Sequence, residues 1–271
     1  AIELLLPELE RGMLDSAWRI RQSSIALTGE LLYKVAGISG KVEIEEDEAP
    51  AMHADTARKA LTEALGQDGR DRVLATLYIV RQDAVSVCRQ ASIHIWKALV
   101  HNTPRTTREI LPILIRLIIE LLGSDSHEQQ GTASRTLGEL CRKNGERILS
   151  EIMPILKNAV TSRDARSREG ACLALTEIMQ TANEDHLEAH EDTIIVAVRV
   201  ALVDPDANVR MAAARTFDAM QEQIGPRAID ETIPTLLEAM SSPGETSETA
   251  LMALKEVMSV SRSISFRGFA R

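Results

Sequence analysis

The stretch REILPILIRL, residues 108–117, decides the fold, because it places Pro112 inside a segment that otherwise has the composition of a buried helix. A proline within a helix removes one backbone hydrogen bond and clashes with the preceding turn, which costs about 3 kcal/mol. The same pattern, an aliphatic residue or methionine followed by proline, any residue and leucine, occurs at Pro7, Pro112, Pro154 and Pro234. A feature that recurs in this way indicates an internal repeat.

A second mark gives the length of the repeat. An arginine opens the segment expected to form the second helix of a unit, as in WRIRQSSIAL and VCRQASIHIW. The positions in this register are Arg21, Arg89, Gln130, Arg168, Arg210 and Ser247, separated by 68, 41, 38, 42 and 37 residues. Steps near 40 residues are typical of HEAT and armadillo units.

We therefore predict an all-α HEAT-repeat solenoid over residues 1–258. Each unit is expected to hold a first helix, bent by proline in four of the units, and a second helix that opens at the register position. The predicted helical pairs are 1–38, 66–101, 104–143, 145–182, 184–222 and 225–259.

Several local signals indicate where these helices begin. Asp15, Asp83 and Asp204 each lie six residues before a register arginine, where a helix N-cap is expected. The string TTRE, residues 106–109, has the form of a capping box ahead of the apolar ILPILI.

Two segments depart from the repeat. GKVEIEEDEAPAMHAD, residues 40–55, is acidic and predicts a solvated loop between the first two pairs, with a contact loop as the alternative. The C-terminal residues 259–271 show no helical period and predict an irregular tail. Because neither end has the polar face of a solenoid cap, we expect the chain to be a slice of a longer array.

Composition narrows the possible functions. The 271 residues are 44% apolar and 3% aromatic and carry a net charge of −9, which argues against an extended nucleic-acid footprint. Residues 66–176 hold a slight excess of Lys and Arg, which suits an acidic protein surface. No apolar run approaches the roughly 20 residues that span a bilayer. Without a signal peptide, a cytosolic protein is expected, with Cys88, Cys141 and Cys172 reduced and mostly buried.

No catalytic constellation is found. The sequence contains none of the glycine-rich phosphate loops or nucleophile motifs of common enzymes, so we expect neither catalysis nor a cofactor. His186 and His190 are four residues apart in HLEAH and could share one helix face. A solvated helix is favoured over a metal site there, because the string is not a metalloprotease motif.

The register arginines have a structural interpretation. In HEAT arrays a residue at the start of the second helix often connects adjacent repeats by hydrogen bonding, and we predict this role for Arg21, Arg89 and Arg210.

The fourth repeat differs, because TSRDARSREGACLAL contains Arg163, Arg166 and Arg168 in and after one turn. Cations near a helix N-terminus are electrostatically disfavoured. Two explanations stay open. Either the three arginines form a solvent-facing cluster for an acidic partner, or they pair locally with Asp164, Glu169 or a neighbouring repeat.

Three strings make a more specific comparison possible: DSAWRIRQSSIALTGELLYKVAGISGK from residue 15, RQASIHIWKALVHNTPRTTREILPIL from residue 89 and SREGACLALTEIM from residue 167. They resemble the general control nonderepressible translational activators, a family of very large ribosome-associated HEAT proteins. The resemblance runs through nearly all of residues 3–258 and points to the C-terminal part of these proteins.

The resemblance implies a non-enzymatic adaptor. In the family this segment binds RWD domains, chiefly that of the starvation-responsive kinase that phosphorylates the α subunit of translation initiation factor two. The family's binding arginine corresponds to Arg168 in Ser167–Gly170, where Glu169 replaces the family's Gln. We therefore expect Arg168 to bind the RWD domain in bidentate fashion, Arg166 and Arg163 to steer its approach, and Glu169 to adjoin the site.

The resemblance also implies a cytoplasmic protein that reaches the ribosome through its full-length chain, with no membrane and no direct nucleic-acid contact from this segment. Two alternatives remain. The segment could dock on ribosomal RNA or a ribosomal protein, or it could serve as a structural spacer without a tight partner.

Overall fold

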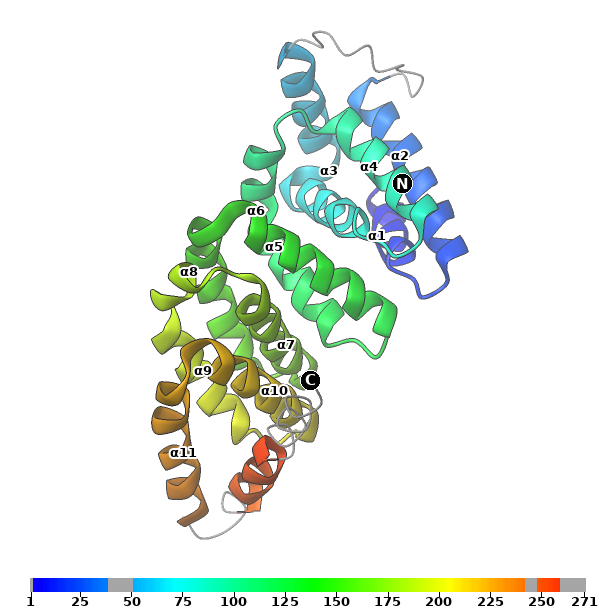
Figure 1. The fold of residues 1–271 in the computed structure, drawn as a ribbon. Helices are drawn as coiled ribbons and strands as arrows, with labels where there is room; N and C mark the ends of the chain where they lie inside the picture. The colour runs from blue at the N-terminus through cyan, green and yellow to red at the C-terminus, as the bar shows by residue number, and fades with distance from the viewer. Residues whose placement is uncertain (1, 39–50, 242–247, 259–271) are drawn as a thin grey trace. The chain divides into compact units, whose positions relative to one another are not determined.

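The computed structural model describes residues 2–38, 51–241 and 248–258, and all regular secondary structure in these ranges is helical. The chain divides into two compact units, Ala1–Leu117 and Ile118–Arg271. The helices form successive pairs joined by short turns (Figure 1), which confirms the all-α HEAT-type fold. The predicted tail, residues 259–271, lies outside the described residues.

The first unit contains α1 to α4 and the first part of α5. Helix α1 packs against α2 and α3, α2 packs against α3 and α4, and α3 packs against α4. Tyr78 and Trp96 meet edge to face in this core, with ring centroids 5.2 Å apart, and the guanidinium of Arg81 lies over both rings. The bounds are α1 Ile2–Met13, α2 Trp18–Ala36, α3 Ala51–Val80, α4 Ser86–Leu99 and α5 Thr103–Leu122.

The second unit begins within α5 and centres on α7 and α10. These two second helices pack against each other, α7 also packs against α6, and α10 packs against α9 and α11. The bounds are α6 His127–Val160, α7 Ala165–Thr181, α8 Glu184–Glu188, α9 Glu191–Leu202, α10 Ala207–Ile224 and α11 Pro226–Ser241, followed by a helix at 248–258.

Two of the long helices are each two helices joined at a glycine. Gly66 in α3 has φ 69° and ψ 167°, and Gly145 in α6 has φ 55° and ψ −144°. A positive φ is open to glycine at little cost, whereas other residues adopt it rarely. The predicted second and fourth pairs begin at these two glycines, so the structure confirms the division into pairs there. The four repeat prolines all lie inside helices, α1, α5, α6 and α11.

Three expectations about element ends were wrong. Residues 51–55, taken as part of the acidic loop, belong to α3, while residues 39–50 lie outside the described residues. The N-caps of α2, α4 and α10 are Ala17, Val85 and Asp206 rather than the aspartates two residues earlier. Helix α5 begins at Thr103, with the side chain of Asn102 accepting the Arg105 N–H at 3.0 Å, so TTRE lies inside the helix and is not its capping box.

The three cysteines are buried, as predicted, and none of them forms a disulfide bond in the described part of the chain. Burial raises the pKa of both Cys141 and Cys172 to about 12. At neutral pH these thiols are therefore protonated and poorly nucleophilic.

Two glycines allow α7 to approach the end of α5 at backbone distance. A Cβ placed on Gly170 would lie 2.0 Å from the carbonyl oxygen of Ile119. A Cβ placed on Gly123 would lie 2.2 Å from the carbonyl oxygen of Arg166. Backbone atoms cannot swing aside as a side chain can, so this contact within the second unit depends on the absence of both Cβ atoms.

We predict that Gly170→Ala destabilises the protein by about 3 kcal/mol, because the helices must separate to admit the methyl group. The matched control is Gly69→Ala, also within a helix, where the nearest atoms to an added Cβ are 3.5 and 3.8 Å away. There the change is expected to stabilise by about 0.5 kcal/mol through a less flexible unfolded chain. Urea unfolding followed by circular dichroism measures both, and equal effects would contradict the close-contact account.

Candidate protein-binding surface

Arg168 joins the fourth repeat to the fifth. Its Nε and Nη2 donate to the two carboxylate oxygens of Asp204 at 2.7 and 2.9 Å. Its Nη1 donates to the carbonyl oxygens of Ser162 and Arg163 at 3.0 and 3.2 Å. A guanidinium has five N–H donors, so this arrangement occupies four of them. The side chains are 14% and 7% exposed, which makes this a largely buried, bidentate ion pair.

Asp204 is itself held in place by the next repeat. Its Oδ1 accepts the backbone N–H of Asp206 at 2.9 Å, and its carbonyl oxygen accepts from Nη1 of Arg210 at 2.9 Å. Arg210, the register arginine of the fifth repeat, therefore fixes the turn that contains Asp204. The carboxylate of Asp204 in turn binds Arg168, the register arginine of the fourth repeat. Sequence reasoning took Asp204 for a helix cap, although its fixed offset of six residues before Arg210 was a signal that it belongs to the repeat.

The first unit contains the same arrangement. Nε and Nη2 of Arg21 donate to Asp83 at 2.7 and 3.1 Å, and Nη1 of Arg21 donates to the carbonyl oxygens of Asp15 and Ser16. Oδ1 of Asp83 accepts the Val85 N–H at 2.7 Å, and its carbonyl oxygen accepts from Arg89 at 2.6 Å. The predicted connection between repeats is thus confirmed for Arg21.

The other register positions keep part of this pattern. The side chain of Gln130 donates to the carbonyl oxygen of Ser124 at 2.7 Å, six residues before it, as the arginines do. Arg210 reaches the helix at 248–258, where its Nη2 donates to the sulfur of Met252 at 3.7 Å, which confirms its predicted role between repeats. Its Nε lies 3.5 Å from Oε2 of Glu256, an ion pair without a hydrogen bond. Arg89 bonds the carbonyl oxygens of Asp83 and Ala84 in its own turn.

Arg163 and Arg166 are exposed. Arg166 and Arg168 nevertheless pair with carboxylates of neighbouring repeats, as the local-pairing interpretation expected. Arg166 pairs with Asp125 of the preceding repeat at 2.6 Å, with the two side chains 64% and 87% exposed. The guanidinium of Arg163 forms no hydrogen bond or ion pair with the residues that the structure describes. Of the three arginines, Arg163 therefore has the most donors open to a partner.

Carboxylates outnumber the arginines at this edge. Asp164 caps α7 by accepting the backbone N–H groups of Arg166 and Ser167. The hydrogen bond from the Ser167 hydroxyl, followed by that from the Ser167 backbone N–H, lowers the pKa of Asp164. Burial, and then the charges of Asp206 and Asp125, raise the pKa of Glu169. The surface is thus of mixed charge rather than a positive cluster, with Arg163, Arg166 and Arg168 beside Asp125, Asp164, Glu169, Asp204 and Asp206.

The two histidines lie in different elements. His186 is in α8 and packs against Gly145, whereas His190 precedes α9, so the two do not share the single helix face that their spacing allowed. Within residues 2–38, 51–241 and 248–258, no group of three or more His, Cys, Asp or Glu side chains is placed to hold a metal ion.

Repeating helical pairs, in which an arginine of one second helix binds an aspartate in the turn before the next second helix, define the class of protein as a HEAT-type helical repeat. Among solved structures, Kap121p bound to Nup53p matches 95% of this chain and 30% of its own chain, with 16% identity and a TM-score of 0.48. A designed armadillo repeat protein matches 93% of this chain and 99% of its own, with 16% identity and a TM-score of 0.34. No family model matches the chain.

Sequence relatives are more specific. The chain is 45% identical over 261 residues to the stalled ribosome sensor GCN1 of Mus musculus, which covers 96% of this chain and 10% of that protein. It is 42% identical over 267 residues to the eIF-2-alpha kinase activator GCN1 of Saccharomyces cerevisiae, covering 98% of this chain and 10% of that protein. The resemblance to the general control nonderepressible family is thereby confirmed, and the chain is a homologue of a segment that makes up a tenth of these relatives' length. None of the helices in the described part of the chain is long and apolar enough to span a membrane.

We predict that Asp204→Asn destabilises the protein by about 2–3 kcal/mol, because Arg168 keeps a largely buried charge without its counter-charge. The matched control is Asp125→Asn, which breaks the exposed pair with Arg166 and is expected to change stability by less than about 0.5 kcal/mol. Urea unfolding of the two variants compares them directly, and a small effect of Asp204→Asn would show that the connection contributes little to stability.

We predict that Glu169→Gln stabilises the protein at neutral pH and that this gain disappears in acid. The pKa of Glu169 is higher in the folded state than in the unfolded state, so folding disfavours the charged carboxylate. Below the unfolded-state pKa the side chain is neutral in both states and costs no stability. As the pH rises through the folded-state pKa, the carboxylate becomes charged and the protein loses stability. Gln stays neutral throughout. Unfolding free energies at pH 7.5 and pH 4 test this, with the exposed Glu120→Gln correcting for the change in net charge. If the gain in stability of Glu169→Gln is equally large at pH 4, it arises from packing and not from removal of the charge.

Proposed function

We propose that this chain is the RWD-binding segment of a translational-control adaptor. On this proposal it holds the RWD domain of the kinase that phosphorylates the α subunit of translation initiation factor two, and the full-length chain brings that kinase to stalled ribosomes in the cytoplasm. The segment performs no chemistry and needs no cofactor. Its contribution is to place one protein next to another.

The homology carries this proposal. Identity of 42–45% extends over 96–98% of the chain, and the relatives are named eIF-2-alpha kinase activator and stalled ribosome sensor. A helical-repeat surface of this kind suits an adaptor, because repeats present long rigid edges to other proteins. Other RWD-domain proteins would compete for the same edge.

The geometry gives the candidate residues different roles. Arg163 and Arg166 are exposed and can contact a partner without breaking any buried bond, so we assign them the direct contacts. Arg168 uses four of its donors on Asp204 and on the turn carbonyls that include Arg163. Its first role is therefore to hold the turn that presents Arg163 and Arg166. A bidentate bond from Arg168 to the RWD domain stays a prediction, and it requires the pair with Asp204 to open.

The mixed charge of the edge indicates what the partner presents. Five carboxylates accompany the three arginines, so a partner with only acidic groups would be repelled as well as attracted. We infer that the RWD surface that binds here offers acidic groups to Arg163 and Arg166 and basic groups to Glu169 and its neighbours. The same balance disfavours the alternative of docking on ribosomal RNA, which needs clustered positive charge.

Calorimetric titration of the chain with the kinase's RWD domain tests the proposal. We expect the double variant Arg163→Gln/Arg166→Gln to weaken binding about ten-fold without changing the melting temperature. Arg168→Ala should weaken binding because it removes the bonds to the turn carbonyls. Asp204→Asn should also weaken it, because the guanidinium of Arg168 loses the counter-charge that holds it in place. Arg116→Gln, an exposed arginine on α5, is the control for the loss of a positive charge.

The pattern across variants separates the possibilities. If Arg168→Ala weakens binding while Asp204→Asn leaves it unchanged or improves it, Arg168 contacts the partner directly and the positioning role is wrong. No binding by the unmodified chain would contradict the adaptor proposal and favour ribosome docking or a spacer.

A further inference from the structure

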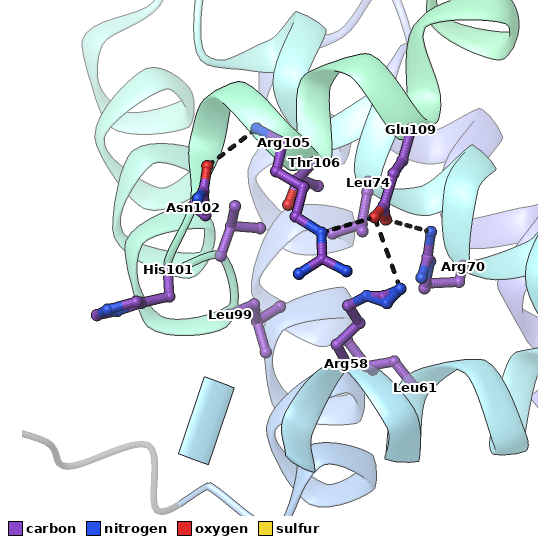
Figure 2. A pocket seen from close by; sticks show the side chains of 11 residues that line it. Arg58, Leu61, Arg70, Leu74, Leu99, His101, Asn102, Arg105, Thr106 and Glu109 are labelled. Atoms are coloured by element: carbon purple, nitrogen blue, oxygen red, sulfur yellow. Dashed lines mark hydrogen bonds and ion pairs between the residues drawn. The ribbon is translucent and has the colours of Figure 1, made fainter. Parts of the chain in front are cut away.

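A pocket of about 170 Å³ lies in the first unit, between α3, the end of α4 and the first turns of α5 (Figure 2). It is independent of the edge proposed for the RWD domain, which lies in the second unit. Arg58, Arg70 and Arg105 converge on it from three helical segments, and His101 and Asn102 lie at its rim. Its apolar wall is formed by Leu61, Leu74, Leu99 and Val100, all buried.

The three arginines share one carboxylate, that of Glu109. Nη2 of Arg70 lies 3.1 Å from Oε2, whereas Nε of Arg105 and Nη2 of Arg58 lie 3.2 and 3.6 Å from Oε1 (Figure 2). Two guanidinium groups thus approach the same oxygen. Asp71 adds a second carboxylate, but it faces Arg70 and Gln67, at 2.8 and 2.7 Å, and does not line the pocket.

Arg70 is the fixed part of this arrangement. Its side chain is 2% exposed and is bonded to Asp71, Glu109 and the hydroxyl of Thr62. A charge buried this deeply must be paired, and here it is. Arg70 therefore anchors Glu109, and Glu109 in turn holds the two more exposed arginines over the pocket.

Arg58 and Arg105 have donors to spare. Nε of Arg58 is buried and has no hydrogen-bond partner among the described residues. Arg105 uses its Nε on Glu109, while its two terminal nitrogens form no bond with the described part of the chain and point into the pocket (Figure 2). Three guanidinium groups against the carboxylates of Glu109 and Asp71 leave a net charge of +1 with His101 neutral. A bound anion would be stabilised here, because it would accept hydrogen bonds from the unsatisfied donors and neutralise the excess positive charge.

The size of the pocket limits what that anion is. Its volume corresponds to about five or six water molecules at roughly 30 Å³ each. Pockets for nucleotide- or drug-sized ligands start at about 300 Å³. One phosphate or carboxylate group fits with its oxygens toward the arginines, and the rest of any larger ligand would remain outside.

The backbone N–H groups at the N-terminus of α5 contribute little to anion binding in this pocket. Asn102 accepts the Arg105 N–H through its side chain and the Thr106 N–H through its carbonyl, and Pro104 has no N–H. The backbone donors of this first turn are therefore largely occupied, and the arginine side chains supply the binding.

We propose that this pocket is a binding site for a compact oxyanion, with Arg58 and Arg105 as its ligands and Glu109 as the group that positions them. A phosphate group is the preferred occupant, because its additional oxygens can accept from both guanidinium groups at once, whereas a carboxylate offers only two.

The test titrates the whole chain with sodium phosphate, and separately with sodium acetate, at ionic strength held constant with sodium chloride. The Nε–Hε resonances of the arginines are followed by heteronuclear NMR, and the melting temperature is measured in parallel. We expect saturable shifts for Arg58 and Arg105 with a dissociation constant of about 1 mM for phosphate, and weaker binding of acetate. Equal binding of acetate would support the site with a carboxylate as its occupant.

Variants connect the signal to the pocket. Arg105→Gln and Arg58→Gln should each weaken phosphate binding about ten-fold, since each removes a charged donor. The matched control is Arg108→Gln, an exposed arginine three residues further along α5 that does not line the pocket, which should leave binding unchanged. Shifts that grow linearly up to about 50 mM, or binding that is equally strong in Arg105→Gln and Arg58→Gln, would overturn the proposal and leave a purely structural ion-pair network.

Discussion

The packing of adjacent repeats depends on the carboxylates that pair with buried arginine side chains. Arg21 and Arg168 each bind the two turn carbonyls before them and an aspartate of the following repeat, and that aspartate is held by the next register residue. A buried charge without a partner is expensive, so each arginine constrains the position of the neighbouring repeat. Apolar packing alone would allow adjacent helices to slide, whereas a bidentate pair admits one geometry.

Gly170 complements this constraint. The arginine connection fixes the height of α7 relative to the next repeat, and the glycine lets the same helix touch the backbone of the preceding one. Within the string Ser167–Gly170, Arg168 thus binds the following repeat and Gly170 packs against the preceding one. The residues best placed to touch a partner, Arg163 and Arg166, lie just before it.

The sequence was sufficient for the helical pairs, because a proline in the first helix of four of the six units and a register position about every 40 residues after the first step are periodic and local signals. It was not sufficient for the partners of those arginines. Asp204 lies 36 residues from Arg168, and its role as a helix cap was equally consistent with its position. Glu109 was likewise interpreted as part of a capping box, although it receives three arginines from a segment up to 51 residues away. Which charged residues pair across 36 to 51 residues of sequence depends on how the helices pack, and a single sequence does not reveal that packing.

Arginines and carboxylates gather both at the edge in the second unit and in the pocket of the first unit, but the balance of charge differs between the two sites. At the edge in the second unit three arginines face five carboxylates, and the largely buried Arg168 uses four of its five donors on Asp204 and on the turn carbonyls. In the pocket of the first unit the arginines exceed the carboxylates, and Arg58 keeps a buried donor unsatisfied. The first arrangement suits recognition of a protein surface with charges of both signs, in which specificity comes from register. The second suits a single anion, because only there does adding a negative group remove both an unpaired donor and an excess charge.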